Sequence, residues 1–470
     1  MLLIVAGGKL MKRLLFHQVA LLLLLALSDG VKGIEGESDV QCKYGKDLTL
    51  LPRPHSVSIL EFGAEGDGKT LNTLAFQNAI FYLRSFADKG GAQLYVPAGS
   101  WLTGSFNLIS HLTLFLEKDA VILGTQDLSL WPVVEPLPSY GRGIELPGER
   151  YRSLINGHQL KDVVITGNNG TIDGQGAVWW EWSSSHSLNY SRPHLVELEN
   201  STDIVISNLT LLNSPAWNIH PVYCSNVQVQ NVTIHAPSDS PYTNGVVPDS
   251  SSDVCIKDSY ISVGHDAISL KSGWDEYGIA FAKPTLNVHI VNVYLHTTFG
   301  SALAFGSEMS GGISDIHAEH LHIRDSFTGI KVKTTQGRGG YIKDIAITNV
   351  EMEDVHMALA LTGHCGGHPD DHFDPGAYPN ITSITVKNVI GTNISIAGNL
   401  TGIHQAPFTA ICLSNISLSI KSESSASWVC SDVSGFSQSV SPEPCSNLQT
   451  PDSSSICFSL LYPNGHAEAL

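Results

Sequence analysis

Basic residues are scarce in this chain of 470 residues, which has 26 lysines and arginines against 44 aspartates and glutamates. The formal net charge is therefore −18 at pH 7. A nucleic-acid-binding protein needs a basic surface to neutralise phosphates, so this balance argues against a nucleic-acid partner. Any other polyanionic ligand would need a local cluster of cations on an otherwise acidic surface.

Long hydrophobic runs are also lacking. The most apolar stretch, Leu14 to Leu27, is too short for a membrane span, which needs about twenty residues. Cations precede it and small residues follow it, as in a secretory signal: Lys9, Lys12 and Arg13 before, and Ser28, Gly30 and Gly33 after. We expect residues 1–33 to be a cleaved signal peptide, with an uncleaved anchor as the alternative. The mature protein is then expected to be secreted to the extracellular space, with no stable membrane span.

The chain has eight cysteines, which secretion makes candidates for disulfides. Spacing alone cannot choose among the possible pairings. The Ser/Pro-rich tail with Cys430, Cys445 and Cys457 is the favoured place for a disulfide. Cys224 and Cys255 lie within strand patterns, where a plain core cysteine is an equal alternative.

Helical periodicity is prominent in one segment after the linker expected at residues 34–57. Residues 58–103 predict a strand, a helix carrying Leu74, Ile80 and Leu83, and a second strand. Thr70 or Asn72 can cap the helix. One helix followed by strands suits a cap that covers the open edge of a strand stack.

A short strand pattern then repeats at intervals of one solenoid turn or more. Each copy has a small polar residue, alternating aliphatic residues and usually a final Asn or Asp, as in Asp203–Asn208, Asn226–Asn231, Asp253–Asp258, Asn287–Asn292, Asp344–Asn349 and Ser383–Asn388. Alternation predicts strands with one buried face, and stacking buries those faces together. We therefore predict an all-β fold, a right-handed parallel β-helix over residues 58–425, with a Cys/Ser-rich tail at 426–470. A propeller or sandwich is the competing architecture, which the irregular spacing disfavours.

Several longer motifs resemble the plant polygalacturonase family, the inverting glycoside hydrolases of pectin. They are Phe62-Gly-Ala-Glu-Gly-Asp-Gly68, Thr171-Ile-Asp-Gly-Gln-Gly176, Asn213-Ser-Pro-Ala-Trp217 and Gly306-Ser-Glu-Met-Ser-Gly-Gly312. The resemblance implies a right-handed parallel β-helix of the pectin-lyase-like type and a galacturonate-containing pectic substrate. It also implies a monomer that needs no metal or organic cofactor.

The catalytic motifs of that family are altered here. Where the resemblance implies Asn-Thr-Asp-Gly, Gly-Asp-Asp and Gly-His-Gly, the sequence has Tyr242-Thr-Asn244-Gly, Gly264-His265-Asp266 and Phe299-Gly300-Ser301. Of the three implied catalytic aspartates only Asp266 remains. His265 stands at the position of the acid, where an imidazolium can donate a proton, and Asn244 cannot replace the missing base. Inverting hydrolysis needs both an acid and a base. Asp249 and Glu308 are further carboxylates that could substitute.

Lysines supply the cationic cluster that the overall charge lacks. Lys331 and Lys333 are two residues apart on a predicted strand and therefore share a face. The family's Arg-Ile-Lys motif, which binds the sugar carboxylate, corresponds to these two positions. With Lys271 and Arg338 they form the candidate binding patch.

Nine Asn-x-Ser/Thr sequons are present. Six are expected surface acceptors for glycans: Asn169, Asn189, Asn200, Asn380, Asn393 and Asn399. The other three, Asn208, Asn231 and Asn415, occupy the bend of the repeat. We expect these three to point into the coil and to stay unmodified.

From the repeats and the resemblance together, we predict a polygalacturonase that hydrolyses α-1,4-galacturonosyl bonds in the cell wall. An inactive pectin-binding protein of the same fold and a hydrolase retargeted to another pectic linkage are the alternatives. A His/Asp-rich loop is weighed as a metal site and set aside because its spacing fits no standard site: His364, Cys365, His368, Asp370, Asp371 and His372.

Overall fold

The computed structural model describes residue 42, residues 52–421, residues 427–449 and residue 457. The signal peptide expected at residues 1–33 lies outside these residues. In the described part of the chain, no helix is both long enough and apolar enough to cross a membrane.

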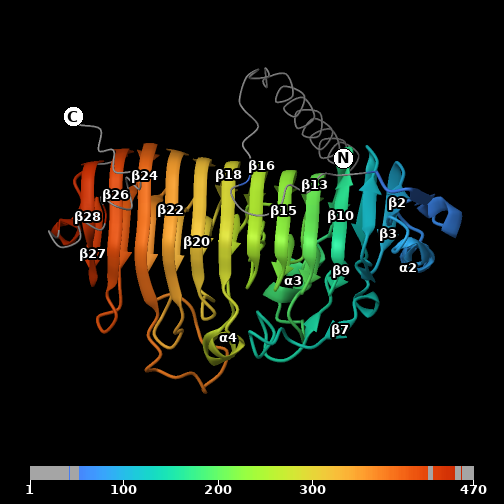
Figure 1. Ribbon diagram of the computed structural model, residues 1–470, viewed down its shortest axis with the longest axis horizontal. Helices are drawn as coiled ribbons and strands as arrows, with labels where there is room; N and C mark the ends of the chain where they lie inside the picture. The colour runs from blue at the N-terminus through green and yellow to red at the C-terminus, as the bar shows by residue number, and fades with distance from the viewer. Residues whose placement is uncertain (1–41, 43–51, 422–426, 450–456, 458–470) are drawn as a thin grey trace, which may run out of the picture. The chain divides into compact units, whose positions relative to one another are not determined.

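Parallel strands stack along the chain, as the repeats predict (Figure 1). The main path of the largest sheet, sheet A, is β1 (His55–Ser58), β2 (Ala92–Val96), β5 (Leu112–Leu116), β10 (Lys161–Gly167), β13 (Thr202–Leu212), β15 (Ser225–His235), β16 (Ser252–Val263), β18 (Thr285–Thr297), β20 (Ile313–Arg324), β22 (Tyr341–Glu353), β24 (Asn380–Ile394), β26 (Phe408–Ile420) and β28 (Val433–Ser441). Beside this path lie β3 (Gly99–Thr103), β6 (Ala120–Gly124) and β11 (Gly170–Asp173).

Two shorter parallel sheets form the opposite face. One contains β4 (Phe106–Asn107), β9 (Ile155–His158), β12 (Val196–Glu199) and β14 (Ile219–Val222). The other contains β17 (Ile268–Leu270), β19 (Ser301–Phe305), β21 (Thr328–Lys333), β23 (Met357–Thr362), β25 (Ile396–Thr401) and β27 (Trp428–Ser431). Val246 and Asp249 bridge β14 to β17, so the two sheets make one continuous face, which we call sheet B. The antiparallel pair β7 (Val133–Val134) and β8 (Arg150–Tyr151) stands apart from it.

The core consists of aliphatic ladders between the sheets. One ladder runs through eight successive coils and is fully or almost fully buried: Ile206, Val229, Ile256, Ile290, Ala318, Ile347, Val386 and Leu413. Each of these residues occupies the second of the two alternating apolar positions in its sequence repeat or in a weaker copy. The parallel β-helix expected from the repeats is therefore the fold found.

The polar residue that ends each repeat forms a bend, as predicted. Asn208, Asn231, Asn292 and Asn388 all have left-handed backbone, with φ between 50° and 56°. Short polar side chains tolerate this conformation better than most. Each bend also bonds to the coil before it, for example from Asn292 Nδ2 to Asp258 Oδ1 at 2.7 Å. Bends and aliphatics together fix the register.

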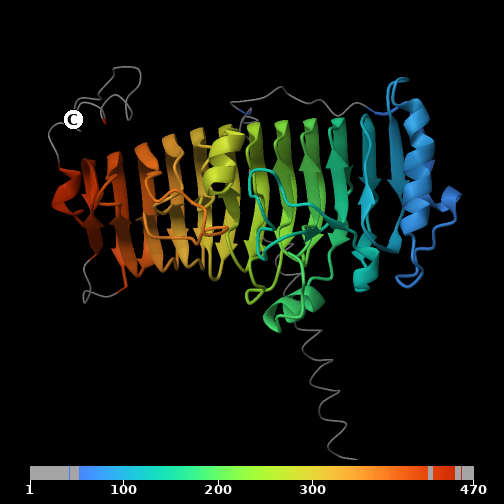
Figure 2. The ribbon, with the colours of Figure 1, turned by 90° about the horizontal axis from the view of Figure 1, so that it is seen from below.

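The predicted helix is α2 (Thr73–Leu83), and it lies at the N-terminal end of the strand stack (Figures 1 and 2). Ile80 and Leu83 are buried as expected, whereas Leu74 is 67% exposed. Asn72 precedes the helix but uses its side chain to bind the Glu65 and Thr70 backbone. The other helices are α3 (Ala177–Ser184), α4 (Asp275–Phe281), and the 3-10 turns η1 (Ile59–Phe62), η2 (Arg84–Phe86), η3 (Leu128–Leu130) and η4 (Ser446–Leu448).

Both expected domain boundaries require correction. β1 begins at His55, within the segment expected to be a linker, and pairs with β2. At the other end, β27 and β28 continue the two sheets beyond residue 425. β27 has only four residues and β28 is rich in serine, so neither shows the aliphatic alternation that marks the earlier coils.

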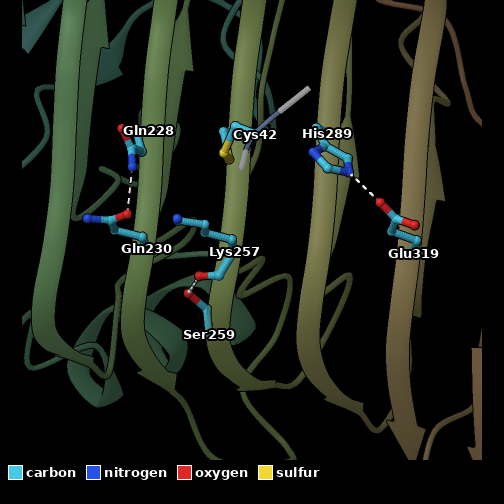
Figure 3. Close-up of a disulfide and its surroundings, with 8 residues drawn as sticks. Cys42, Gln228, Gln230, Lys257, Ser259, His289 and Glu319 are labelled. Atoms are coloured by element: carbon cyan, nitrogen blue, oxygen red, sulfur yellow. Dashed lines mark hydrogen bonds and ion pairs between the residues drawn. A yellow bond between two sulfur atoms is a disulfide. The ribbon is translucent and has the colours of Figure 1, made fainter. Parts of the chain in front are cut away.

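Three disulfides occur among the described residues. Cys430–Cys445 and Cys412–Cys457 staple the C-terminal coils, which confirms the tail as a disulfide region. Cys42–Cys255 joins residues 213 apart, on the outer face of β16, between Gln228 and His289 of the adjacent strands (Figure 3). Cys255 is thus a disulfide partner, whereas Cys224 is a buried free cysteine and Cys365 a free one at intermediate exposure.

Candidate active-site groove

The outer face of sheet B carries a groove of about 800 Å³. All six residues predicted for catalysis or substrate binding line it: Asn244, His265, Asp266, Lys271, Lys331 and Lys333. Strand alternation explains their common direction, because Ile330 and Val332 of β21 are buried in the core while the lysines between and after them face out.

Asn244 forms hydrogen bonds with His265 and Asp266, which lie on the next coil. Its side-chain oxygen Oδ1 accepts the backbone N–H of Asp266 at 3.1 Å and lies 2.9 Å from Nδ1 of His265. Because a backbone N–H can only donate, Oδ1 is an acceptor, and Nδ1 of His265 carries the proton of their shared bond. In the neutral imidazole the other nitrogen, Nε2, is then unprotonated.

Asp266 is the single carboxylate left from the expected catalytic set. It is 1% exposed and forms an ion pair with Lys333. It also accepts the backbone N–H of Ser301 at 2.9 Å and the hydroxyl of Ser269 at 3.3 Å. Burial alone would raise the pKa of Asp266, but the charges of Lys333 and His265 outweigh burial and hold that pKa well below its usual range. Asp266 is therefore a permanent carboxylate.

A second carboxylate in the groove is also ionised. Glu308 pairs with Lys271, and Ser307 Oγ donates to its Oε1 at 3.0 Å. Burial would raise the pKa of Glu308, but Lys271 and then Arg338 lower it to about 2. The Lys271 ammonium also lies 5.4 Å from the ring centre of Trp217. Glu308 thus enters the site as a charge partner of Lys271.

Among the residues of the altered catalytic motifs, His265 is the one whose charge can change near neutral pH. Burial lowers the pKa of His265 below its usual 6.5, and the negative charge of Asp266 offsets this only in part. Its side chain remains 28% exposed to the groove. At neutral pH the imidazole is therefore mostly uncharged.

The three groove lysines differ in what they face. Lys333 and Lys271 are committed to Asp266 and Glu308. Lys331 is half-buried, and among the described residues no ion pair or hydrogen bond engages its ammonium group. Lys331 is consequently the cation most available to a negatively charged ligand.

Two expectations about the charged residues are wrong. Arg338 does not belong to the groove patch: it is fully buried, pairs with Asp275 and donates to the backbone carbonyl of Ser307 at 2.8 Å. Asp249 cannot replace the missing base, because it is fully buried and accepts hydrogen bonds from Tyr140 and His220.

Sequence reasoning missed several contributors to the groove, which come from distant loops. Glu145 and Leu146 precede β8, and Cys365 to Gly367 follow β23. Tyr242 and Phe299 lie within motifs already singled out, and they expose 60% and 65% of their surface at the rim. An exposed large aromatic beside an altered catalytic motif was the available signal for them.

Within the described part of the chain, two clusters hold enough donor atoms to consider a metal. The buried group His194, Glu197 and His220 has its donors already engaged, since Glu197 pairs with Arg150 and His220 lies between Glu197 and Asp249. The second group is Glu276, Asp370 and His372. Of the loop considered from sequence, Asp370 and His372 belong to this second group, whereas His368 pairs with Asp275 and Cys365 lines the groove.

Most of the sequon asparagines are exposed residues. Asn169, Asn189, Asn200, Asn380 and Asn393 are exposed, and Asn399 is partly buried. The bend asparagines Asn231 and Asn415 do not point into the coil as expected: they are exposed, and they donate to Asn208 and Asn388 of the preceding coils. Glycan occupancy at all nine stays a prediction.

Solved structures similar to this chain share its architecture. An exopolygalacturonase from Thermotoga maritima has a TM-score of 0.72 at 24% identity, covering 84% of this chain and 93% of that one. A polygalacturonase from Erwinia carotovora has a TM-score of 0.66 at 21% identity, covering 84% and 100%. These likenesses place the fold in the class of polygalacturonase-type parallel β-helices.

Sequence comparison identifies the family. The family model for Glycosyl hydrolases family 28 matches residues 144–442. A relative named "Probable polygalacturonase" from Vitis vinifera is 49% identical over 448 residues, covering 93% of this chain and 89% of the relative. A polygalacturonase from Chamaecyparis obtusa is 26% identical, covering 94% and 84%. The chain belongs to glycosyl hydrolase family 28.

Proposed function

We propose that this protein is a secreted hydrolase of the plant cell wall that cleaves α-1,4-galacturonosyl bonds of pectic polysaccharide. Family membership, with 49% identity to a relative named as a polygalacturonase, is the observation that carries this proposal. The groove supports it, because the three residues at the altered catalytic motifs and three lysines converge there.

Hydrolysis with inversion requires a water molecule, a base that accepts its proton and an acid that protonates the leaving oxygen. Asp266 is the proposed base: it is ionised at all working pH values and can accept the water proton as the hydroxyl bonds to the anomeric carbon. Its ion pair with Lys333 makes it a weak base, so the rate is expected to be low.

His265 is the proposed acid. Its Nδ1 is held by Asn244, so the transferable proton is the one on Nε2 of the imidazolium. This proton goes to the glycosidic oxygen as the bond to the anomeric carbon breaks. The acid form exists only below the lowered pKa of His265, so we assign the activity to acidic conditions.

Lys331 is the proposed contact for a galacturonate carboxylate. It is the groove lysine not engaged by a protein carboxylate among the described residues, and a compact ammonium is suited to a single charged contact. Lys333 and Lys271 contribute to the positive field while they hold Asp266 and Glu308 in place.

A pectin-binding protein without turnover is the second candidate. Asp266 and Glu308 are both ionised by their paired lysines, so neither can serve as the acid. Asn244 bonds to His265 and Asp266 but cannot accept a proton. If His265 does not act as the acid, the groove retains binding and loses hydrolysis.

Reducing-end release from de-esterified polygalacturonate by the purified protein tests the proposal, with Asp266→Asn assayed beside it. Release that is lost in Asp266→Asn is the expected result. Binding of the same polymer without release from either protein would establish the second candidate.

Lys331→Ala tests the binding role under both candidates. We expect about a tenfold rise in Kd for an oligogalacturonate, because one charge-assisted contact is lost. Lys343→Ala is the matched control, since Lys343 lies on β22 of sheet A, away from the groove lining, has a partly exposed side chain and pairs with Asp344. Equal affinity in both variants would remove Lys331 from the site.

A further inference from the structure

A segment between β7 and β8 crosses the outer face of sheet B. We call residues 135–149 the strap. In Figure 2 this teal segment passes in front of the green strands, beside α4. Its ends are joined at the antiparallel pair of β7 and β8, so the strap is a closed excursion over the sheet.

The strap is held on the side where the strands of sheet B end. The backbone N–H of Ser139 donates to the Tyr223 hydroxyl at 3.1 Å, and the Ser139 carbonyl accepts from Trp274 at 2.8 Å. Tyr223 directly follows β14, and Trp274 follows β17 by a few residues. Leu137 and Tyr140 pack with these two aromatics in one buried cluster.

It is also held on the side where the strands begin. Glu145 forms an ion pair with Arg192, which precedes β12. The same guanidinium donates from Nη1 to the carbonyls of Pro215 at 2.9 Å and Pro241 at 3.0 Å, on the next two coils. Arg142 makes a further contact: its Nη1 donates to the carbonyl of Pro369, in the loop after β23, at 2.9 Å. The strap is therefore anchored on both edges of sheet B.

Where the strap crosses sheet B, it covers the outer face of the strands beneath it. Val247 and Asp249 are fully buried, Tyr140 bonds to Asp249 from above, and Ile144 packs against Trp217 and Val247. Two separate cavities result. Ile144 to Leu146 line the groove of about 800 Å³, and Glu135 to Pro138 line a second cavity of about 620 Å³ on the N-terminal side.

From this geometry we infer that the groove accepts one end of a pectic chain and not its interior. A polysaccharide lying along sheet B through the catalytic residues meets the strap and cannot continue across it. The protein is accordingly exo-acting, with the terminal sugars held between the strap and Lys331. This inference rests on the proposed function for its substrate.

The distribution of early products tests the mode of action. From de-esterified polygalacturonate we expect one small product from the first time points, with viscosity falling slowly relative to reducing ends. A ladder of intermediate oligomers at the first time points would overturn the inference.

Binding tests the inference even if hydrolysis fails. Two size fractions of polygalacturonate that differ about tenfold in chain length are titrated at equal uronate concentration. If the protein binds chain ends, the Kd expressed as the concentration of chains is the same for both fractions. The Kd expressed as the concentration of uronate is then about tenfold higher for the longer fraction. A Kd per uronate that is equal for both fractions would show that the chain passes through, which overturns the inference without affecting the substrate assignment.

A variant of the strap tests whether these residues stop the polysaccharide from passing along sheet B. Arg142→Ala combined with Glu145→Ala removes the contacts to Pro369 and Arg192, and we expect the dependence of Kd on chain length to weaken. Glu135→Ala, an exposed position on the same segment, is the control and should behave as the unaltered protein. Unchanged length dependence in the double variant would contradict the role of the strap.

Discussion

At the scale of the residue, the chemistry of the groove is decided by which charge each group faces. Asp266 and Glu308 are carboxylates in one groove, the first fully buried and the second partly exposed, and each is kept ionised by a lysine. Neither of these two carboxyls is therefore poised to donate a proton near neutral pH. His265 is the residue of the altered catalytic motifs that can, and Asn244 fixes which of its nitrogens does so.

Restoring the missing carboxylates should restore rate. We expect the double variant Asn244→Asp with His265→Asp to release reducing ends at least 10²-fold faster, because acid and base catalysis each contribute about 10² to 10⁴. Two neighbouring carboxyls would also raise one pKa, which supplies the acid. Reducing-end assays at saturating polygalacturonate measure kcat for the two proteins.

The single variant Asn244→Asp is the control for this restoration. It adds a negative charge next to His265 and Asp266 but no acid, so its gain should be smaller than that of the pair. A double variant that binds polygalacturonate and stays as slow as the parent would exclude the assigned positions.

The pH dependence of turnover should follow His265. Burial lowers its folded-state pKa below 6.5, so the acid form accumulates only as the pH falls through that lowered value. Asp266 stays ionised over the same range because its pKa is held far lower. The rate should thus rise from pH 7 toward moderately acidic pH, as measured by initial rates across a buffer series.

His265→Ala gives the matching test. We expect loss of turnover of about 10²-fold or more at acidic pH, with Kd for oligogalacturonate changed little. An unaltered pH profile in this variant would show that His265 is not the titrating acid.

At the scale of the element, much of the fold could be predicted because each coil obeys one local rule. Alternating aliphatics mark the buried face, and the final Asn or Asp marks the left-handed bend, as at Asn231 and Asn292. The rule fails where other forces replace it. The serine-rich strand β28 pairs with its neighbour β26 and is flanked by the Cys430–Cys445 disulfide, and its sequence lacks the alternating aliphatics of the repeat.

The bend of β18 offers a stability test of this rule. Asn292→Ala should destabilise the protein by about 1–3 kcal/mol, since alanine in left-handed backbone costs about 1–2 kcal/mol and the bond to Asp258 is lost. Thermal or denaturant unfolding measures the change.

Asn292→Gly separates the two contributions. Glycine adopts the same backbone at little cost, so this variant should lose only the side-chain hydrogen bond. If both variants unfold at the same temperature as the parent, the bend does not contribute to stability.

At the scale of the whole molecule, the candidate site was predictable to the extent that it lies on the repeat. Lys331 and Lys333 follow from strand alternation, and the groove gathers all six predicted residues. The strap and the burial of Arg338 and Asp249 were not predictable, because they depend on loops that meet across long stretches of sequence, such as Tyr140 with Asp249. Local patterns carry no information about such contacts.

The extent of the β-helix leads to a last prediction. A chain ending at residue 425 lacks β27 and β28, which pair with β25 and β26. Trp428 and Val433 are buried in the core, and Cys457 bonds to Cys412, so truncation exposes the open end of the stack. Terminal repeats without a cap expose apolar surface and unpaired backbone, so we expect the truncated chain to aggregate.

In the full chain, the double variant Cys430→Ser with Cys445→Ser should lower the free energy of unfolding by about 3 kcal/mol, given a closed loop of this length, but leave the protein soluble. Size-exclusion chromatography and thermal unfolding distinguish the two, and a soluble truncated chain with unchanged melting temperature would return the boundary to residue 425.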